Sequence, residues 1–358
     1  MYFDFDNIYN GKTVLITGAT GFKGSWLSIW LKELGANVIG YSLNPKTKKD
    51  NFILAELSKK IIDIRGDIRD YSNLEAVFNE YKPDYVFHMA AQPLIEESYL
   101  NPILTYEINL MGTLNMLECI KKSNRHLVAI FITTDKCYSN KEQVWGYKET
   151  DSLGGYDPYS SSKAACEIAI NSWRESYMSP KMYHKHGKAI SSVRSGNVIG
   201  GGDWSEKRII PDCIRALESQ SDIILRSPNS IRPWQYVLEP LYGYLLLGQK
   251  MKLNPTKYSD AWNFGPKIDS VVDVKYIVEM LIKYYGKGSW RCLENSSFHE
   301  TKMLNLDVSK AIFELGWKPT LSIDEALKFT SEWYQRYHCS DIYSLCVNQI
   351  NNFISLIK

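Results

Sequence analysis

Two short stretches of the sequence carry side chains whose types and spacing suggest catalysis. The segment "TTDKCYSN", residues 133–140, places Thr134, Asp135 and Lys136 in succession directly after the apolar run "LVAIFI", where a buried strand should end. The segment "YSSSK" holds Tyr159 and Lys163 four residues apart at the start of a predicted helix, so both side chains project from one helix face. A lysine ammonium beside a phenol favours the phenolate and lowers the phenol's pKa from about 10, so this pair has the makings of an acid/base.

A third stretch, "TGATGFKG", places Gly18, Gly21 and Gly24 directly after the apolar run "TVLI" and at the opening of a helix that begins near Phe22. Glycines in this context allow a tight turn and a close approach of backbone N–H groups to a pyrophosphate, at the positive end of the helix dipole. The spacing G-x-x-G-x-x-G departs from G-x-G-x-x-G. The segment predicts a dinucleotide site, and a packed strand-to-helix turn is the structural alternative.

The elements that must position these groups alternate between apolar runs and helical stretches through the first half of the chain. Strands are predicted near residues 13–18, 37–42, 61–67, 85–91, 127–134 and 189–197, and helices near residues 22–34, 73–81, 102–122 and from Pro158 onward. Continuous apolar strands separated by helices indicate a parallel sheet covered on both faces. The fold class predicted is therefore α/β, a Rossmann-type doubly wound sheet.

The second half of the chain differs in composition from the first. Clusters of glycine, proline and tryptophan such as "NVIGGGDW" and "NSIRPWQYVLEP" predict a smaller α/β domain with shorter elements. We therefore expect a dinucleotide-binding domain over residues 1–196 and a substrate-binding domain over residues 197–358, continuous by default, although later segments can return to the first sheet.

Composition limits the function classes. The 358 residues are 44% hydrophobic, enough for two domains, and a net charge of +2 favours neither a nucleic-acid partner nor an anionic membrane. Seven cysteines without a C-x-x-C pair predict reduced thiols and no metal site. The N-terminus lacks the apolar core of a signal peptide and nowhere do about 18 apolar residues run together, so a cytoplasmic location is expected.

Taken together, the glycine turn, Thr134, Tyr159 and Lys163 resemble the extended short-chain dehydrogenase/reductase superfamily, and the resemblance runs through nearly the whole chain to "LGWKP", residues 315–319. It implies oxidation or reduction of a sugar carbon with a nicotinamide. Thr134 would hydrogen-bond the sugar C4 oxygen, Tyr159 would remove its proton, and Lys163 would also hold the nicotinamide ribose.

Within that superfamily the sequence resembles the nucleotide-sugar 4,6-dehydratases, which carry an acid directly after the Thr. The resemblance makes Asp135 the general acid that protonates the departing C6 hydroxyl. The next residue takes the C5 proton and is Glu in many relatives, whereas here it is Lys136. Because an ammonium cannot accept a proton, Lys136 acts as a base only if its pKa is lowered; stabilising an enolate, or a purely structural Asp-Lys ion pair, are the alternatives.

Four segments, "TTDKCYSN", "YDPYSSSKA", "RSGNVIGGGDW" and "RPWQYVLEP", together resemble the dehydratases that act on CDP-glucose. That subgroup implies CDP-glucose as substrate, a role in deoxysugar biosynthesis for surface polysaccharides, and a homodimer built on helices near residues 102–122 and 158–178. The alternatives are a dehydratase of another nucleotide sugar, a nucleotide-sugar 4-epimerase or 4-reductase, which needs no acid for a C6 leaving group, and a non-enzymatic NAD(H) sensor.

The resemblance also assigns the cofactor site. The residues it places there are Gly18, Gly21, Phe22, Gly24, Ser42, Asp67, Ile68, Ala90, Ala91, Gln92, Asn109, Tyr159 and Lys163. An NAD-binding Rossmann domain usually presents an acid after its second strand for the ribose 2′-hydroxyl, but "GYSLNPKTKK" offers only Ser42 and Asn44 there. The lysines that follow suit a 2′-phosphate, so NAD is expected and NADP stays open.

For the substrate diphosphate, Arg232 in "IRPWQ" is the first choice, because its planar fork can chelate phosphate oxygens. Asn197 and Arg208 are the next candidates. Trp204 has the shape to stack on the base, although tryptophan is more often core. His88 is expected to be a satisfied core histidine.

Overall fold

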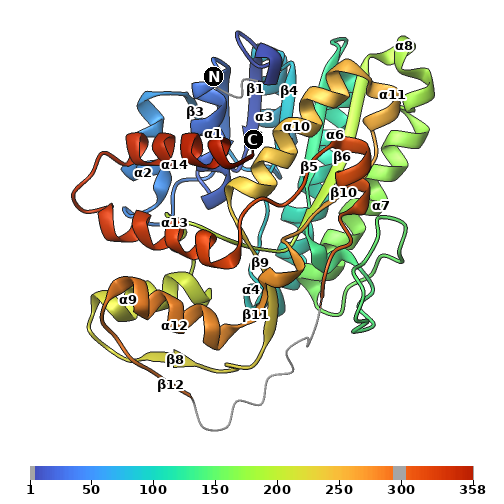
Figure 1. Ribbon diagram of the computed structural model, residues 1–358. Coiled ribbons are helices and arrows are strands. Elements are labelled where there is room, and N and C mark those ends of the chain that lie inside the picture. The colour runs from blue at the N-terminus through green and yellow to red at the C-terminus, as the bar shows by residue number, and fades with distance from the viewer. Residues whose placement is uncertain (1–4, 293–303, 358) are drawn as a thin grey trace.

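The computed structural model describes residues 5–292 and 304–357. Its centre is a seven-stranded sheet in the order β10-β6-β5-β4-β1-β2-β3, and every pairing in it is parallel. Figure 1 shows this sheet at the top of the molecule with helices on both sides. The strands are β1 Thr13–Thr17, β2 Asn37–Ser42, β3 Ile62–Arg65, β4 Tyr85–His88, β5 Leu127–Ile132, β6 Lys188–Ser195 and β10 Ala261–Phe264. The predicted doubly wound α/β class is confirmed.

Two cores cover the two faces of this sheet. On β1, Val14 and Ile16 belong to one hydrophobic cluster with residues of α1 and α10, whereas Leu15 belongs to a second cluster with residues of α3, α6 and α7. Successive side chains of a strand point to opposite faces, so an unbroken apolar strand feeds both cores. These helices are α1 Phe22–Glu33, α3 Tyr71–Tyr81, α6 Gly112–Lys122, α7 Pro158–Ser176 and α10 Leu238–Leu253.

The helix predicted over residues 102–122 forms in three parts. Helix α5 (Pro102–Tyr106) runs into a π-helical turn, η3 (Glu107–Met111), which continues into α6. Single π turns often occur at functional sites, and this one carries Asn109. Among the residues described, no helix is both long and apolar enough to cross a membrane.

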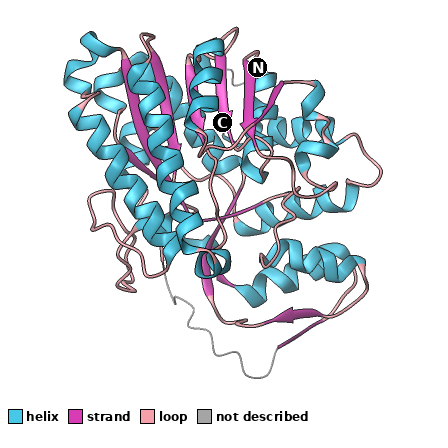
Figure 2. Ribbon diagram, turned by 180° about the vertical axis from the view of Figure 1, so that it is seen from behind, coloured by secondary structure: helices cyan, strands magenta, loops and turns pink. Residues whose placement is uncertain are grey.

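The remaining elements lie mainly beneath the C-terminal edge of the sheet, at the bottom of Figures 1 and 2. One small sheet has the order β11-β9-β7, and a second pairs β12 with β8. Strands here are β7 Asn197–Ile199, β8 Ile223–Leu225, β9 Ile231–Tyr236, β11 Val271–Asp273 and β12 Trp290–Cys292. The further helices of the chain are α2 Asn51–Leu54, α4 Ile95–Leu100, α8 Tyr183–His186, α9 Ile209–Glu218, α11 Pro255–Tyr258, α12 Val274–Tyr285, α13 Ile323–Arg336 and α14 Ile342–Ile357.

The default of two continuous halves needs a correction. Strand β10 pairs in register with β6, Ala261 opposite Ser192, and α10 packs on β5 and β6, so both belong to the first sheet although they follow residue 197. In addition, α14 packs on α1. The boundary at residues 196 and 197 therefore does not separate the two structural units, because the chain leaves the large sheet after β6 and returns to it.

Candidate active site

The glycine turn joins β1 to α1 and brings the chain against the end of β4. Gly18 has φ +75°, and a Cβ on it would lie 2.9 Å from the backbone nitrogen of Ala90. A Cβ on Gly24 would lie 2.1 Å from the carbonyl oxygen of Gly18. Gly21 is the exposed N-cap residue of α1, and no side chain caps this end. The first N–H groups of α1 therefore point out of the helix without an intrahelical partner, a suitable cradle for a pyrophosphate.

The end of β2 lies beside this turn. Ser42 is buried, and its hydroxyl accepts a hydrogen bond from the backbone N–H of Thr20 at 3.3 Å. Thr20 in turn donates from its hydroxyl to the carbonyl of Leu43 at 3.1 Å. Ser42, expected to contact the ribose, thus lies beside the glycine turn with its hydroxyl bonded to that turn. Neither Ser42 nor its chain neighbours Tyr41 and Leu43 is an acid, so none of the three supplies the carboxylate that usually binds the ribose 2′-hydroxyl.

Asp67 and Ile68 follow β3. Asp67 pairs with Arg69 at 2.6 Å, and this guanidinium lowers the pKa of the Asp67 carboxyl. Ile68 is buried against Gly112 of α6, where a Cβ would lie 2.6 Å from the Ile68 side chain. Both residues thus lie at the C-terminal edge of the sheet, where the adenine was expected, with Asp67 held in place by a basic neighbour.

After β4 the backbone of residues 89–92 is held by side chains. The Thr17 hydroxyl accepts hydrogen bonds from the N–H groups of Met89 and Ala90, both at 3.1 Å, and Ala91 follows directly. Asn109, on the π-helical turn, accepts from the Gln92 N–H at 2.8 Å and donates to the Gln92 carbonyl at 3.1 Å. Asn109 thus fixes the backbone that runs under the glycine turn.

His88 ends β4 and is a buried core histidine, as predicted. One ring nitrogen lies 3.0 Å from the Thr17 hydroxyl and the other 3.3 Å from the Thr113 hydroxyl. Burial, with the nearby charge of Lys163, lowers the pKa of His88 to about 3. The imidazole is therefore neutral and occupied on both sides.

The residues predicted to transfer protons, Thr134, Asp135 and Lys136, form a turn at the end of β5 that we call the catalytic turn. A short 3-10 helix, η4 (Asp135–Cys137), begins there. Thr134 caps that helix, and its hydroxyl donates to a carboxylate oxygen of Asp135 at 3.0 Å. Lys136 Nζ lies 3.3 Å from the same oxygen. The Asp135 side chain keeps 2% of its surface exposed and that of Lys136 29%, so the acid is held inside the site and the amine lies at its edge.

Tyr159 and Lys163 come to this turn from the first two turns of α7, which Asp157 caps at the N-terminus. Lys163 donates from Nζ to the carbonyl of Ile132 at the end of β5, at 3.3 Å. The side chains of Tyr159 and Thr134 are hydrogen-bonded to each other. The structure therefore brings together the five residues predicted to be catalytic.

The expected direction of the Tyr159 pKa is corrected. Burial raises the pKa of Tyr159 to about 12, while the Thr134 hydrogen bond and the charge of Arg208 act in the opposite direction. Lys163 is itself buried, which lowers its pKa, and its amine is turned to the Ile132 carbonyl. The lysine therefore does not by itself turn the phenol into a base, because removal of the phenol from water is the larger effect.

Lys23 is a site residue that sequence reasoning missed. It lies inside the glycine turn, and burial, with the charges of Lys163 and Arg208, lowers its pKa to about 7, while Asp135 acts to raise it. A lysine between Phe22 and Gly24 in a turn otherwise made of small and apolar residues was the available signal. Lys23 therefore adds a group that titrates near neutral pH to the electrostatics of the catalytic turn.

The predicted substrate residues lie on elements that border the catalytic turn. A Cβ on Gly196 would lie 3.0 Å from the Asp135 carboxylate and 3.5 Å from Pro233, so the start of β7 and the strand β9 meet at the acid. Asn197 follows Gly196, and Arg232 precedes Pro233. Arg232 donates to the carbonyl of Ile231 at 2.8 Å.

Arg208 lies at the N-terminus of α9 and pairs with Asp203 at 3.0 Å, close enough to Tyr159 for their charges to interact. Trp204, by contrast, packs between Tyr334 and Tyr337 and is 7% exposed. It is a core residue in this structure and does not offer a free face to a base.

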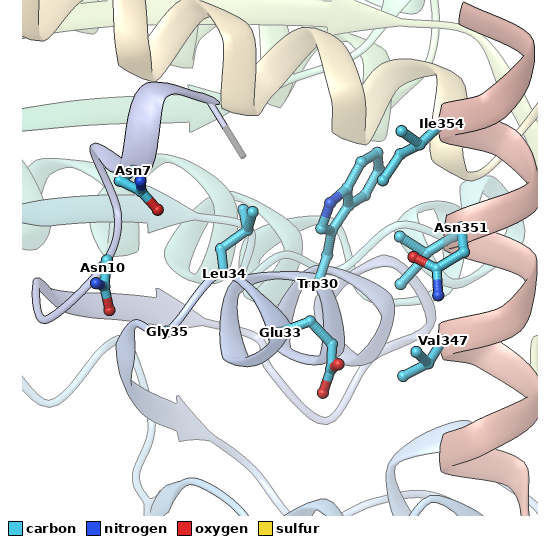
Figure 3. Close-up of a pocket in the computed structure, with 10 residues that line it drawn as sticks. Asn7, Asn10, Trp30, Glu33, Leu34, Gly35, Val347, Asn351 and Ile354 are labelled. Atoms are coloured by element: carbon cyan, nitrogen blue, oxygen red, sulfur yellow. The ribbon is translucent and has the colours of Figure 1, made fainter. Parts of the chain in front are cut away.

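A cavity of about 260 Å³ lies elsewhere, at the C-terminal end of α1 and against α14. Figure 3 shows Trp30 and Glu33 on one side of it and Asn351 on the other. The glycine turn lies at the opposite end of the same 12-residue helix, about 18 Å away at 1.5 Å per residue. This cavity is therefore separate from the catalytic turn.

A seven-stranded doubly wound sheet with a glycine turn after β1, a Thr at the end of β5 and a Tyr-Lys pair on α7 defines a nicotinamide-dependent enzyme of the extended short-chain dehydrogenase/reductase class. Residues 15–330 match the family model described as GDP-mannose 4,6 dehydratase, and the chain belongs to that family.

Among the relatives, the chain is 44% identical over 351 residues to the CDP-glucose 4,6-dehydratase of Salmonella typhimurium strain LT2, which covers 98% of both chains. It is 24% identical to the dTDP-glucose 4,6-dehydratase of Haemophilus influenzae, covering 90% of this chain and 97% of that one. The crystal structure of dTDP-glucose 4,6-dehydratase from Bacillus anthracis in complex with NAD has the same fold, with a TM-score of 0.75 at 20% identity over 91% of this chain and 97% of that one.

Proposed function

We propose that this chain is a CDP-D-glucose 4,6-dehydratase, a hydro-lyase that converts CDP-glucose to CDP-4-dehydro-6-deoxy-D-glucose and supplies deoxysugars for surface polysaccharides. The observation that carries the proposal is Asp135, a buried acid hydrogen-bonded to Thr134 and next to Lys136, directly beside Tyr159. An acid in that position suits a reaction in which a hydroxyl leaves from C6, two carbons from the site of oxidation. The 44% identity to a CDP-glucose 4,6-dehydratase over 98% of the chain supports the choice of reaction and of base.

The residues present fit NAD. The cradle consists of the uncapped first turn of α1, Gly21 without a side chain, and the backbone of Ala90 that Gly18 allows to approach. Bound there, the oxidised nicotinamide would accept a hydride from the sugar, return it later, and place a positive charge near the phenol. Ser42 and Asp67 would contact the adenosine half, and Ala90, Ala91 and Gln92 the other half.

The chain's own residues divide the work between C4 and C6, the two carbons on either side of C5. Tyr159, with Thr134 bonded to it, would take the proton from the C4 hydroxyl, and Lys163 would orient the ribose beside it. Asp135 would donate a proton to the C6 hydroxyl as it leaves as water. The pKa of Tyr159 is raised to about 12, chiefly by burial, even with the lowering by Thr134 and Arg208, so forming the phenolate would require further positive charge beside the phenol.

Lys136 would remove the C5 proton or stabilise the enolate that forms. The ketone at C4 acidifies that proton, so only a modest base is required. Lys136 Nζ lies 3.3 Å from an Asp135 oxygen. Removal of the C5 proton requires the neutral amine beside the protonated acid, and after the step Lys136 holds the C5 proton and Asp135 is a carboxylate; as an ammonium, Lys136 can only stabilise the enolate. The two groups would therefore act as one unit across C5 and C6.

The second structural unit would hold the nucleotide diphosphate. Gly196 and Pro233, the chain neighbours of Asn197 and Arg232, meet at the acid, and Arg208 lies close to Tyr159. Asn197, Arg208 and Arg232 would together bind the diphosphate. Residues 1–196, with α10, β10 and α14, would bind the dinucleotide, and the elements of the two small sheets the nucleotide sugar.

A homodimer in the cytoplasm is part of the proposal. Helices α4 to α7 expose large apolar side chains that a second copy would cover: Leu100, Ile103, Met111 and Ile168. The seven cysteines are free, five of them buried, which suits a reducing compartment.

The second candidate is a nucleotide-sugar 4-epimerase, because the solved structures with the same fold include UDP-glucose 4-epimerase from Thermotoga maritima, with a TM-score of 0.74 at 23% identity over 90% of this chain and 99% of that one. Incubation with CDP-, dTDP-, GDP- and UDP-glucose, each with NAD or NADP, separates the two. The expected result is a 4-keto-6-deoxy product from CDP-glucose with NAD. An isomeric sugar that keeps its C6 hydroxyl would instead identify an epimerase.

A further inference from the structure

Behind the catalytic turn lies a buried ion pair that the reaction scheme above does not use. Glu167 is on α7, one helical turn after Lys163, and Arg194 is on β6. Their side chains expose 1% and 4% of their surface, and Arg194 Nη2 lies 2.7 Å from a carboxylate oxygen of Glu167. Glu167 also accepts hydrogen bonds from the hydroxyls of Thr133 and of Ser192. Its carboxylate is thus bonded at once to Thr133, which follows β5, to Ser192 of β6 and to the guanidinium.

Arg194 connects this ion pair to Tyr138, which follows the catalytic turn in the sequence. Its Nη1 donates to the Tyr138 hydroxyl at 2.7 Å and to the carbonyl of Glu149 at 3.1 Å. The Tyr138 hydroxyl donates onward to Asn263 of β10 at 2.8 Å, and the Tyr138 ring stacks on Tyr147. We call the six side chains of this network the buried brace: Thr133, Tyr138, Glu167, Ser192, Arg194 and Asn263.

The brace encloses the catalytic turn on both sides in the sequence. Thr133 precedes Thr134, and Tyr138 follows Lys136 by two residues. Glu167 is on the same helix as Tyr159 and Lys163. The brace therefore ties the turn that carries the acid to the helix that carries the phenol and the amine.

A stabilising role alone does not explain the charges. Moving two charges out of water has a penalty that their attraction often fails to repay, so an apolar pair of the same volume is commonly as stable. A charged pair does fix geometry, because each bond has a direction and any displacement leaves a buried charge unpaired. A reaction that needs five side chains placed around three carbons depends on such fixed geometry.

We propose, on the basis of the proposed function, that Glu167 and Arg194 are positioning residues of the dehydration, which hold the turn of Thr134, Asp135 and Lys136 at its working distance from Tyr159 and Lys163. Neither side chain touches the substrate. Both act through the residues that do.

The charge of Glu167 adds a second effect. It is one of the charges that raise the pKa of Lys163 against the lowering by burial. The titratable groups that interact with Lys163 are Cys166 and Glu167 on α7, Cys137 in η4, Lys23 in the glycine turn and His88 at the end of β4. Loss of the Glu167 charge removes a negative charge that raises the Lys163 pKa and leaves the positive charge of Arg194 uncompensated nearby. Both changes lower the Lys163 pKa.

The test compares Glu167→Gln with a matched control, Glu239→Gln. Glu239 is a carboxylate on α10 that is buried to the same degree and is bonded by the backbone N–H groups of Thr320 and Leu321, outside the brace. Wild-type conversion of CDP-glucose is measured first, because that result alone tests the proposed function. The ratio of each variant to wild type then tests the brace.

For E167Q we expect kcat to fall about 10- to 100-fold, since a misplacement of about 1 Å has that effect, while KM and NADH binding stay within about threefold. We also expect the alkaline limb of the kcat profile to move to lower pH. E239Q should keep the kcat and the pH profile of the wild type. A folded E167Q with wild-type kcat and pH profile would overturn the proposal, as would an equal loss in E239Q.

If E167Q does not fold, Tyr138→Phe carries the test, because it removes one hydroxyl and leaves the ion pair intact. The expected result is a fall in kcat of about fivefold or more at unchanged KM. An unchanged kcat in folded Y138F would then overturn the role of the brace.

Discussion

The glycine turn and the catalytic turn both follow a buried strand of the same sheet, yet they are built in different ways. The glycine turn consists of backbone that fits closely, with Gly18 against Ala90 and Gly24 against the Gly18 carbonyl. The catalytic turn consists of side chains, Thr134, Asp135 and Lys136, each bonded to another.

We relate the difference to what each region is proposed to hold. A dinucleotide pyrophosphate is bound by N–H groups, so the first turn must keep side chains out of the way. Proton transfer needs groups with particular pKa values, so the second turn must bury side chains and compensate their charges. Changes in the first region should therefore affect binding and stability together, and changes in the second should affect turnover alone.

The largest effect is expected from Asp135→Asn. The amide keeps the size and a hydrogen-bond acceptor for Thr134 but cannot donate a proton to the leaving hydroxyl. We expect kcat to fall by about 10² to 10⁴ while the CDP-glucose Kd and the melting temperature stay near wild type. Product formation and calorimetric binding measure the two. Near-normal turnover would remove Asp135 as the acid and with it the contrast between the two turns.

Lys136→Met addresses the neighbouring carbon. The methionine keeps the length of the side chain without its amine, so exchange of the C5 proton with solvent should slow by about tenfold or more. Deuterium incorporation at C5 is the measurement. Exchange at the wild-type rate would assign Lys136 to its ion pair with Asp135 and not to proton transfer.

Gly18→Ala tests the other turn, with Gly286→Ala as its control. Both glycines have a positive φ, +75° and +72°, but a Cβ meets the Ala90 backbone at Gly18 and meets nothing within 4 Å at Gly286. We expect both variants to lose about 1 kcal/mol or more of unfolding free energy through strain, and only Gly18→Ala to weaken NADH binding, by about tenfold. Equal NADH affinity in the two variants would mean that the close fit to residue 90 has no part in cofactor binding.

The smallest effect is expected from Glu239, outside both turns. Burial raises its pKa to about 7 from an ordinary value of 4.5, so its carboxyl favours the folded state in the neutral form. That stability is fully present below pH 4.5 and is lost as the pH rises through about 7. The melting temperature of Glu239→Gln relative to wild type should therefore rise by about 2 to 5 °C between pH 5 and pH 8. A difference that does not change with pH would contradict the burial of an ionisable group there.

Some of the site could be read before any coordinates. Gly18, Gly21 and Gly24 were readable because a strand, a turn and a helix follow one another within 21 residues. Tyr159 and Lys163 were readable because a helix places residues four apart on one face. The sequence left open whether a later segment returns to the first sheet, but it did not identify β10 as that segment. The strand "AWNF" has four residues, and no local feature shows that it pairs with β6.

The contacts among the predicted residues could not be derived from the sequence. The sequence suggested a phenol made basic by its lysine, whereas the fold turns Lys163 toward the Ile132 carbonyl and buries Tyr159 deeply enough to raise its pKa. Likewise Trp204, a candidate for base stacking, is packed between two tyrosines of the C-terminal segment.

By itself, the sequence determined the alternation of strands and helices and the glycine turn, because each depends on residues within one turn or one strand; the acid role of Asp135 stays a prediction. Only the tertiary structure decided which groups Glu167 and Arg194 join, where Lys23 lies, and how far each pKa is displaced. The physical reason is that burial and charge depend on neighbours brought from distant parts of the chain, and local sequence does not record their distances.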